Sequence, residues 1–75
     1  VVLIDRGNAF HDKGDYRAAI RDYTEAIRID PKDPIAYSNR GNSNYRAGDM
    51  KAAVEDYTRS LELDPKNGSL FNSRG

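Results

Sequence analysis

The chain has 75 residues, and its 12 basic side chains balance its 12 acidic ones. A net charge of zero excludes the general positive field on which non-specific nucleic-acid binding depends, and it gives no attraction to an anionic membrane. The absence of cysteine excludes disulfides and thiolate metal sites and, with no apolar run long enough to span a membrane, favours a cytoplasmic location.

Helical periodicity begins with the first residues. Leu3, Gly7 and Phe10 share one face of a helix expected over residues 1–13. Gly14 is expected to end it in the left-handed conformation, and Asp15 is expected to cap the next helix. That second helix spans residues 16–29 and carries a stronger stripe, formed by Tyr16, Ala19, Ile20, Tyr23, Ala26 and Ile27.

The pattern then repeats. Asp33 caps a third predicted helix over residues 34–47, and Asp49 opens a fourth that ends at Asp64. The stripe of the fourth helix comprises Met50, Ala53, Val54, Tyr57, Ser60 and Leu61. The segment GDYRAAIRDYTEAIRIDP, residues 14–31, returns as GDMKAAVEDYTRSLELDP, residues 48–65, at an offset of 34 residues. Such short connections between helices predict antiparallel pairs in an all-α fold.

These residues resemble the signature of the tetratricopeptide repeat. The first copy matches it at Leu3, Gly7, Phe10, Ala19, Tyr23 and Pro31, and the second at Tyr37, Gly41, Ala53, Tyr57 and Pro65. The resemblance implies a right-handed α-solenoid of antiparallel helix pairs that acts as a protein–protein interaction scaffold. Repeat one would span residues 1–33, repeat two residues 34–67, and residues 68–75 would start a third repeat or form a capping helix.

The sequence departs from the family pattern at two kinds of position. Arginine replaces the usual leucine at positions 6, 40 and 74, and we expect its stem to cover apolar surface while its guanidinium reaches water. Asn44 takes an aromatic position, which is expected to weaken local packing. Asp22 and Asp56 recur in step with the repeat, so we interpret them as structural, in caps or as surface charge.

Nothing in the sequence predicts catalysis. His11 is the only histidine, so no second imidazole can complete a metal site, and no glycine-rich phosphate loop is present. A helix-turn-helix DNA binder is disfavoured because the most basic helix, residues 16–29, mixes its arginines with Asp22 and Glu25. We therefore predict no enzyme activity, no cofactor and no bound metal.

Recognition is predicted on the first helix of each repeat, which lines the concave groove in proteins of the family. Asparagine both donates and accepts hydrogen bonds, and arginine can grip a carboxylate, so this surface suits an extended peptide or partner segment. An alternative interpretation is that these side chains are merely solvated. The predicted groove residues are Ile4, Asn8, His11, Ser38, Asn39, Asn42, Tyr45 and Arg46.

Some family members hold acidic chaperone C-termini with a carboxylate clamp. Asn8 and Asn39 match the two asparagines of that clamp, but Ile4, Ser69 and Ser73 stand where it has basic residues. A buried carboxylate needs cationic partners, so strong binding of chaperone tails is not expected unless Arg46 or Arg74 replaces them.

The alternative function is self-association. A repeat stack needs about three repeats with polar caps, and this sequence carries two and the start of another. The fourth predicted helix would leave an apolar end to be covered by residues 69–75 or by another copy of the chain.

Overall fold

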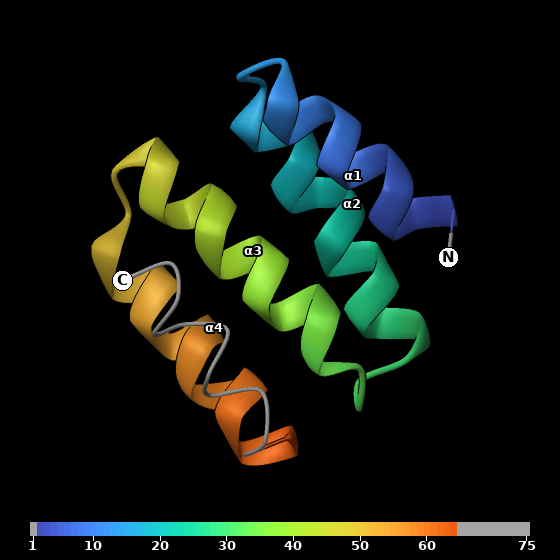
Figure 1. The fold of residues 1–75 in the computed structure, drawn as a ribbon, viewed down its shortest axis with the longest axis vertical. Helices are drawn as coiled ribbons and strands as arrows, with labels where there is room; N and C mark the ends of the chain where they lie inside the picture. The colour runs from blue at the N-terminus through green and yellow to red at the C-terminus, as the bar shows by residue number, and fades with distance from the viewer. Residues whose placement is uncertain (1, 65–75) are drawn as a thin grey trace.

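The structure, a computed structural model, describes residues 2–64 and consists there of four α-helices. They are α1 (Val2–Asp12), α2 (Tyr16–Ile29), α3 (Pro34–Ala47) and α4 (Met50–Leu63). Figure 1 shows them as two successive antiparallel pairs, and packing joins α1 to α2, α2 to α3 and α3 to α4. The predicted all-α repeat fold is confirmed. The predicted third-repeat segment lies outside the described residues.

The helix boundaries follow from the local sequence. The side chains of Asp15, Asp33 and Asp49 accept hydrogen bonds from backbone amides in the first turns of α2, α3 and α4. Each cap satisfies an amide that would otherwise have no partner within its helix. Gly14 and Gly48 have φ angles of 86° and 94°, in the left-handed region, and so end α1 and α3 as expected.

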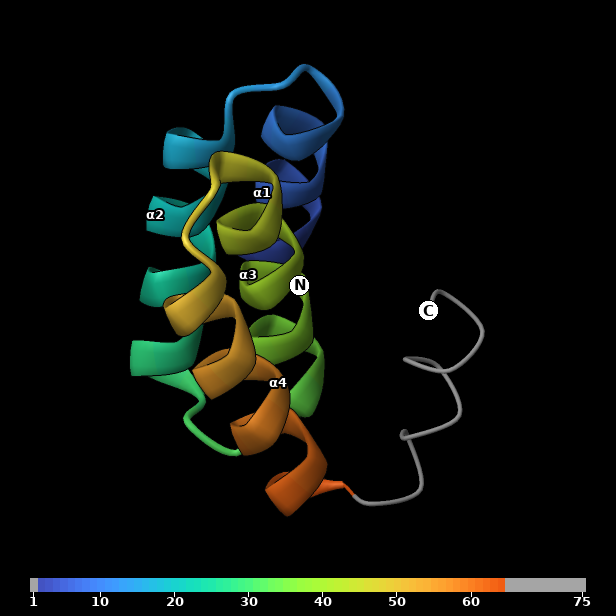
Figure 2. The ribbon, with the colours of Figure 1, turned by 90° about the vertical axis from the view of Figure 1, so that its left-hand side faces the viewer.

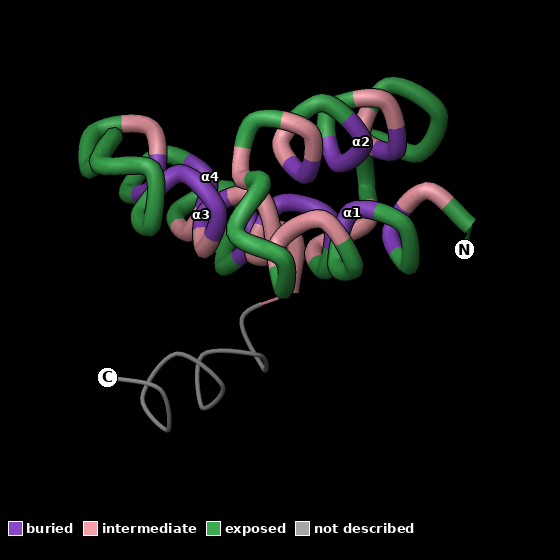
Figure 3. The backbone as a smooth tube through the Cα atoms, turned by 90° about the horizontal axis from the view of Figure 1, so that it is seen from above, coloured by how far each residue is buried: buried purple, intermediate pink, exposed green. Residues whose placement is uncertain are grey.

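The helices are arranged in two layers. Figures 2 and 3 show α1 and α3 in one layer and α2 in the other, while α4 packs on α3 and runs obliquely from the level of α2 towards that of α1. We call the outer side of the first layer the α1–α3 face. The buried residues lie mainly between the layers (Figure 3), in a core formed by Ile4, Ala19, Tyr23, Ala26 and Ala36.

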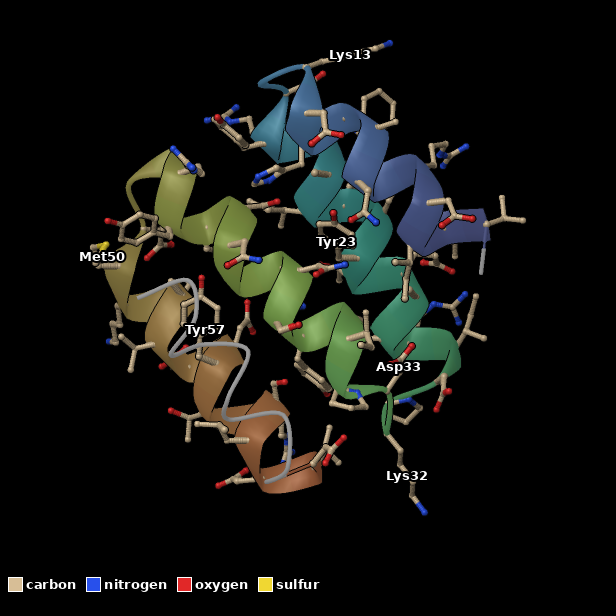
Figure 4. All side chains as sticks on the ribbon, viewed as in Figure 1. Lys13, Tyr23, Lys32, Asp33, Met50 and Tyr57 are labelled. Carbon is tan, nitrogen blue, oxygen red and sulfur yellow. The ribbon has the colours of Figure 1, made fainter. Side chains whose placement is uncertain are left out.

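Small residues let each helix pair approach closely. Ala19 and Ala53 are almost fully buried, and Tyr23 and Tyr57 occupy matching places in the two pairs (Figure 4). A Cβ atom added to Gly7 would lie 2.6 Å from Cε1 of Tyr23. The tyrosine ring therefore occupies the space that a side chain at position 7 would need.

The apolar stripe expected on α4 is divided between two environments. Ala53 and Ser60 are buried, whereas Met50, Val54 and Leu61 are 53%, 60% and 37% exposed. Met50 lies at the outer edge of the molecule, on the side away from α1 (Figure 4). Within residues 2–64, half of the stripe therefore has no helix packed on it.

Replacement Gly7→Ala should destabilise the fold. Overpacking against Tyr23 costs about 1–3 kcal/mol, which outweighs the gain of about 1 kcal/mol in helix propensity. Urea unfolding followed by circular dichroism measures the change. Ala9→Gly, at an exposed position of α1, is the control that changes propensity alone. A Gly7→Ala variant more stable than the wild type contradicts the close approach.

Candidate functional site

An ion pair joins the two helices of each repeat. Nε and Nη2 of Arg6 donate to both carboxylate oxygens of Asp22 at 2.8 and 2.9 Å. Arg40 makes the same pair of bonds to Asp56 at 3.0 and 2.7 Å. The two aspartates are only 3% and 5% exposed, so the expectation that they serve as caps or surface charges is wrong. The paired bonds fix the orientation of both side chains.

The two arginines differ in their environment. The Arg6 side chain is 59% exposed, as expected for a guanidinium that reaches water, but that of Arg40 is 23% exposed. Nη1 of Arg40 donates to Oγ1 of Thr24 at 3.2 Å, and its guanidinium lies 5.7 Å from the centre of the Tyr37 ring. Arg40 therefore connects the second repeat to α2 of the first.

Electrostatics favours the ionised state of the first pair. The hydrogen bonds from Arg6 hold the pKa of Asp22 below its ordinary value of 3.8, although burial opposes this shift. The same contact raises the pKa of the Arg6 guanidinium. Asp22 is thus ionised and holds Arg6 of α1 through two hydrogen bonds.

Asn44, which takes an aromatic position of the family pattern, also has a hydrogen-bond partner. Asn44 is 8% exposed, and its Nδ2 donates to Oδ2 of Asp56 at 2.8 Å. The first repeat has Phe10 at the equivalent position. Asparagine at position 44 instead gives the buried Asp56 carboxylate a third side-chain hydrogen bond, beside the two from Arg40. The expected loss of packing at Asn44 is accompanied by this polar contact.

Tyrosines of α2 and α4 orient asparagines of α1 and α3. The hydroxyls of Tyr23 and Tyr57 donate to Oδ1 of Asn8 and Asn42, respectively. Burial raises the pKa of Tyr23 to about 12, so its hydroxyl keeps its proton at neutral pH. Nδ2 of Asn39 also donates to Oδ1 of Asn8, at 3.1 Å. This bond joins α1 to α3 across the repeat boundary.

A second hydrogen bond joins α1 to α3. Nδ1 of His11 lies 2.8 Å from Oγ of Ser43, which is fully buried. The His11 ring also meets the Tyr16 ring edge to face, with centres 5.1 Å apart. His11 therefore packs between neighbouring helices and is half-buried.

The other predicted groove residues are spread more widely. Ile4 is 8% exposed and belongs to the core, so it has little surface for a ligand. Oγ of Ser38 donates to the backbone carbonyl of Ile35 at 3.1 Å. Tyr45 and Arg46 are exposed in the last turn of α3. The structure thus brings Asn8, Asn39 and His11 to the boundary between α1 and α3.

Sequence reasoning missed the ion pairs and the roles of Thr24 and Ser43. A signal for the ion pairs was present, because arginine precedes aspartate by 16 residues at positions 6 and 22 and again at 40 and 56. Thr24 and Ser43 carry no comparable signal, since each contacts a residue of the other repeat.

Residues 2–64 contain neither a membrane-spanning helix nor a cluster of metal-ligating side chains. No helix in this part of the chain is long and apolar enough to span a membrane. No group of three or more His, Asp or Glu residues there is arranged to hold a metal ion.

Family models match this chain at both repeats. A TPR repeat model matches residues 7–48, which is more than half of the chain, and a tetratricopeptide repeat model matches residues 34–67. The chain belongs to the tetratricopeptide repeat family. Tetratricopeptide repeats are protein-interaction repeats, so this chain is a protein–protein interaction module.

Two curated relatives match over 35 residues, or 47% of this chain. Stress-induced-phosphoprotein 1 of Caenorhabditis elegans is 49% identical, and Hsp70-Hsp90 organizing protein 2 of Arabidopsis thaliana is 54% identical. The matched segment covers 11% of the first relative and 6% of the second. The similarity therefore concerns about one repeat of two much longer proteins.

Replacement Arg40→Leu, which restores the residue usual in the family, should lower the free energy of unfolding by about 3–5 kcal/mol. The reason is that Asp56 would remain buried without its cation. The double variant Arg40→Leu/Asp56→Asn should recover part of the loss, because no charge is then buried. Arg59→Leu, which removes an exposed pair with Glu62, is the control and should cost less than about 1 kcal/mol. Equal losses in Arg40→Leu and Arg59→Leu would contradict the role of the buried pair.

Acid should weaken the fold through Asp22. Because its pKa is lower in the folded state, its stabilising contribution is present above the ordinary value of 3.8 and is lost as pH falls through the folded-state value. The free energy of unfolding should therefore decrease between about pH 5 and pH 2. Asp22→Asn should flatten this decrease, and Asp5→Asn, at an exposed position of α1, should preserve it. Chemical unfolding at a series of pH values tests both.

Proposed function

We propose that the α1–α3 face binds an extended segment of a partner protein. The observation that carries the proposal is the contact between Asn8 and Asn39, which come from neighbouring repeats. Oδ1 of Asn8 accepts from both Tyr23 and Asn39, so its position is held from two sides. Nδ2 of Asn8 and Oδ1 of Asn39 have no partner among residues 2–64 and remain for a ligand. One donor beside one acceptor complements a peptide unit, which offers the same two groups.

The ligand that fits this face is a neutral segment. The Arabidopsis relative is named for Hsp70 and Hsp90, but this chain lacks basic residues at three positions where a carboxylate clamp has them. Ile4 is buried where a carboxylate clamp would place a cation, and Ser69 and Ser73 stand at its other basic positions. A terminal carboxylate bound here would lose its hydration without gaining a cation in return.

Replacement Asn39→Ala should weaken peptide binding about twofold to thirteenfold, which is the effect of losing one hydrogen bond of about 0.5–1.5 kcal/mol. Peptides selected from a random display library serve as ligands, and fluorescence anisotropy measures their affinity. Arg17→Ala, at an exposed position of α2, is the matched control and should leave the affinity unchanged. Equal affinities for the wild type and Asn39→Ala would contradict binding at this face.

A second experiment tests the chemistry of the ligand. Acidic peptides with a free C-terminus should bind more weakly than neutral internal segments of equal length. An acidic peptide that binds at micromolar concentration and weakens with added salt would overturn this part of the proposal, and would point to Arg46 or Arg74 as the cation.

Self-association is a second candidate function, and the exposed half of the α4 stripe favours it. Met50, Val54 and Leu61 are exposed, whereas the residues 34 positions earlier, Tyr16, Ile20 and Ile27, are partly buried. Burying this apolar surface between two copies of the chain would be favourable.

Light scattering over a concentration series tests self-association. The mean molecular mass should rise with concentration if the exposed stripe is an interface. A constant monomer mass at every concentration would contradict this second candidate and would leave peptide binding untouched.

A further inference from the structure

The contact between the two repeats suggests how two chains would meet. Three side-chain hydrogen bonds cross the boundary: Arg40 to Thr24, Asn39 to Asn8, and His11 to Ser43. Each joins a residue of the first repeat to a residue of α3. The same boundary buries Ala36 of α3 completely, with Ile27 of α2 packed against the same core.

The C-terminal side of the molecule carries the first half of this interface again. A shift of 34 residues takes Tyr16, Ile20 and Ile27 of α2 to Met50, Val54 and Leu61 of α4. The same shift takes Thr24 to Thr58, which is exposed and has no hydrogen-bond partner among residues 2–64. Of the α2 residues, Ile27 packs on the core that holds Ala36, and Thr24 bonds Arg40, so the surface around Leu61 and Thr58 on α4 repeats the part of α2 that receives α3.

The N-terminal side carries the second half. The same shift takes Ala36 and Arg40 of α3 back to Val2 and Arg6 of α1. Val2 is 79% exposed, whereas Ala36 is completely buried. Arg6 bonds Asp22 through Nε and Nη2, as Arg40 bonds Asp56, and this leaves Nη1 of Arg6 for another partner. In Arg40 that third nitrogen binds Thr24.

We propose that a second copy of this chain docks its α1 on the exposed stripe of α4, in the register that α3 takes on α2. Nη1 of Arg6 in one copy then donates to Oγ1 of Thr58 in the other. This inference rests on the self-association candidate above and specifies its geometry. The interface joins two different surfaces, so it leaves one free at each end and extends into an open head-to-tail assembly.

The two remaining boundary contacts also find compatible partners. In the proposed contact, Asp5 of the docking copy takes the position of Asn39, and Asn42 of the receiving copy takes the position of Asn8. Oδ1 of Asn42 accepts from Tyr57, so its Nδ2 can donate to the carboxylate of Asp5. His11 and Ser43 correspond to Tyr45 and Ala9, and the small Ala9 leaves room for the larger ring. The exposure of Tyr45, which is 53%, is explained by this contact.

Two single variants test the α1 surface and the α4 surface of the proposed interface independently. Ala9→Glu blocks the surface on α1, and Val54→Asp blocks the surface on α4; both residues are exposed, so neither change disturbs the core. The matched control is Ile29→Asp, because Ile29 stays 65% exposed although α3 packs on α2. Sedimentation equilibrium of the 75-residue chain from about 10 µM to about 1 mM covers the weak affinities of small interfaces.

The wild type and Ile29→Asp should associate, and each blocking variant alone should associate at least about tenfold more weakly, because an unpaired charge would be buried. An equimolar mixture of Ala9→Glu and Val54→Asp should form a dimer and nothing larger, since each supplies the surface that the other lacks. Association of Ala9→Glu alone, or a mixture that stays monomeric, overturns the head-to-tail register and leaves self-association standing. A wild type that is monomeric throughout overturns both. Association that appears only after deletion of residues 69–75 overturns the proposal in favour of those residues as the occupant.

Discussion

Two buried carboxylates constrain this small domain. Asp22 and Asp56 lie on the second helix of each pair, almost without exposure, and each must be matched by an arginine from the first helix. A buried charge without such a partner is strongly unfavourable, so the ion pair sets how the two helices lie against each other. In the second pair Arg40 also reaches Thr24, and the same side chain thereby helps to align the repeats.

The candidate site depends on the packing between the helices of each pair. Tyr23 packs against Gly7 in the core and extends its hydroxyl to Asn8 at the surface. Because the ring is locked by packing, the amide of Asn8 is held in place, and Asn39 is positioned through it. The core and the candidate site are thus coupled through one tyrosine, and the second repeat keeps the same contact between Tyr57 and Asn42.

Local chemistry explains why so much of the fold could be predicted. Apolar spacing, aspartate caps and the glycines at 14 and 48 act within a few residues, so the first residues of α2 and α3 were predicted correctly and their last residues approximately. The function of single side chains was harder to predict, because periodicity assigns a face and not a partner. Ile4 was assigned to the groove but is buried in the core, and Asp22 was assigned to the surface or a cap but is buried beneath Arg6.

The sequence by itself determined the all-α repeat, its period of 34 residues, its turns and its family, because these follow from local propensity and from internal repetition. Only the tertiary structure decided which polar residues are buried, since that depends on contacts between positions 12 to 32 residues apart. It also decided which half of the α4 stripe is covered by α3 and which half is exposed. The physical reason is that a hydrogen bond or a buried charge is satisfied by geometry, and two helices must pack before that geometry exists.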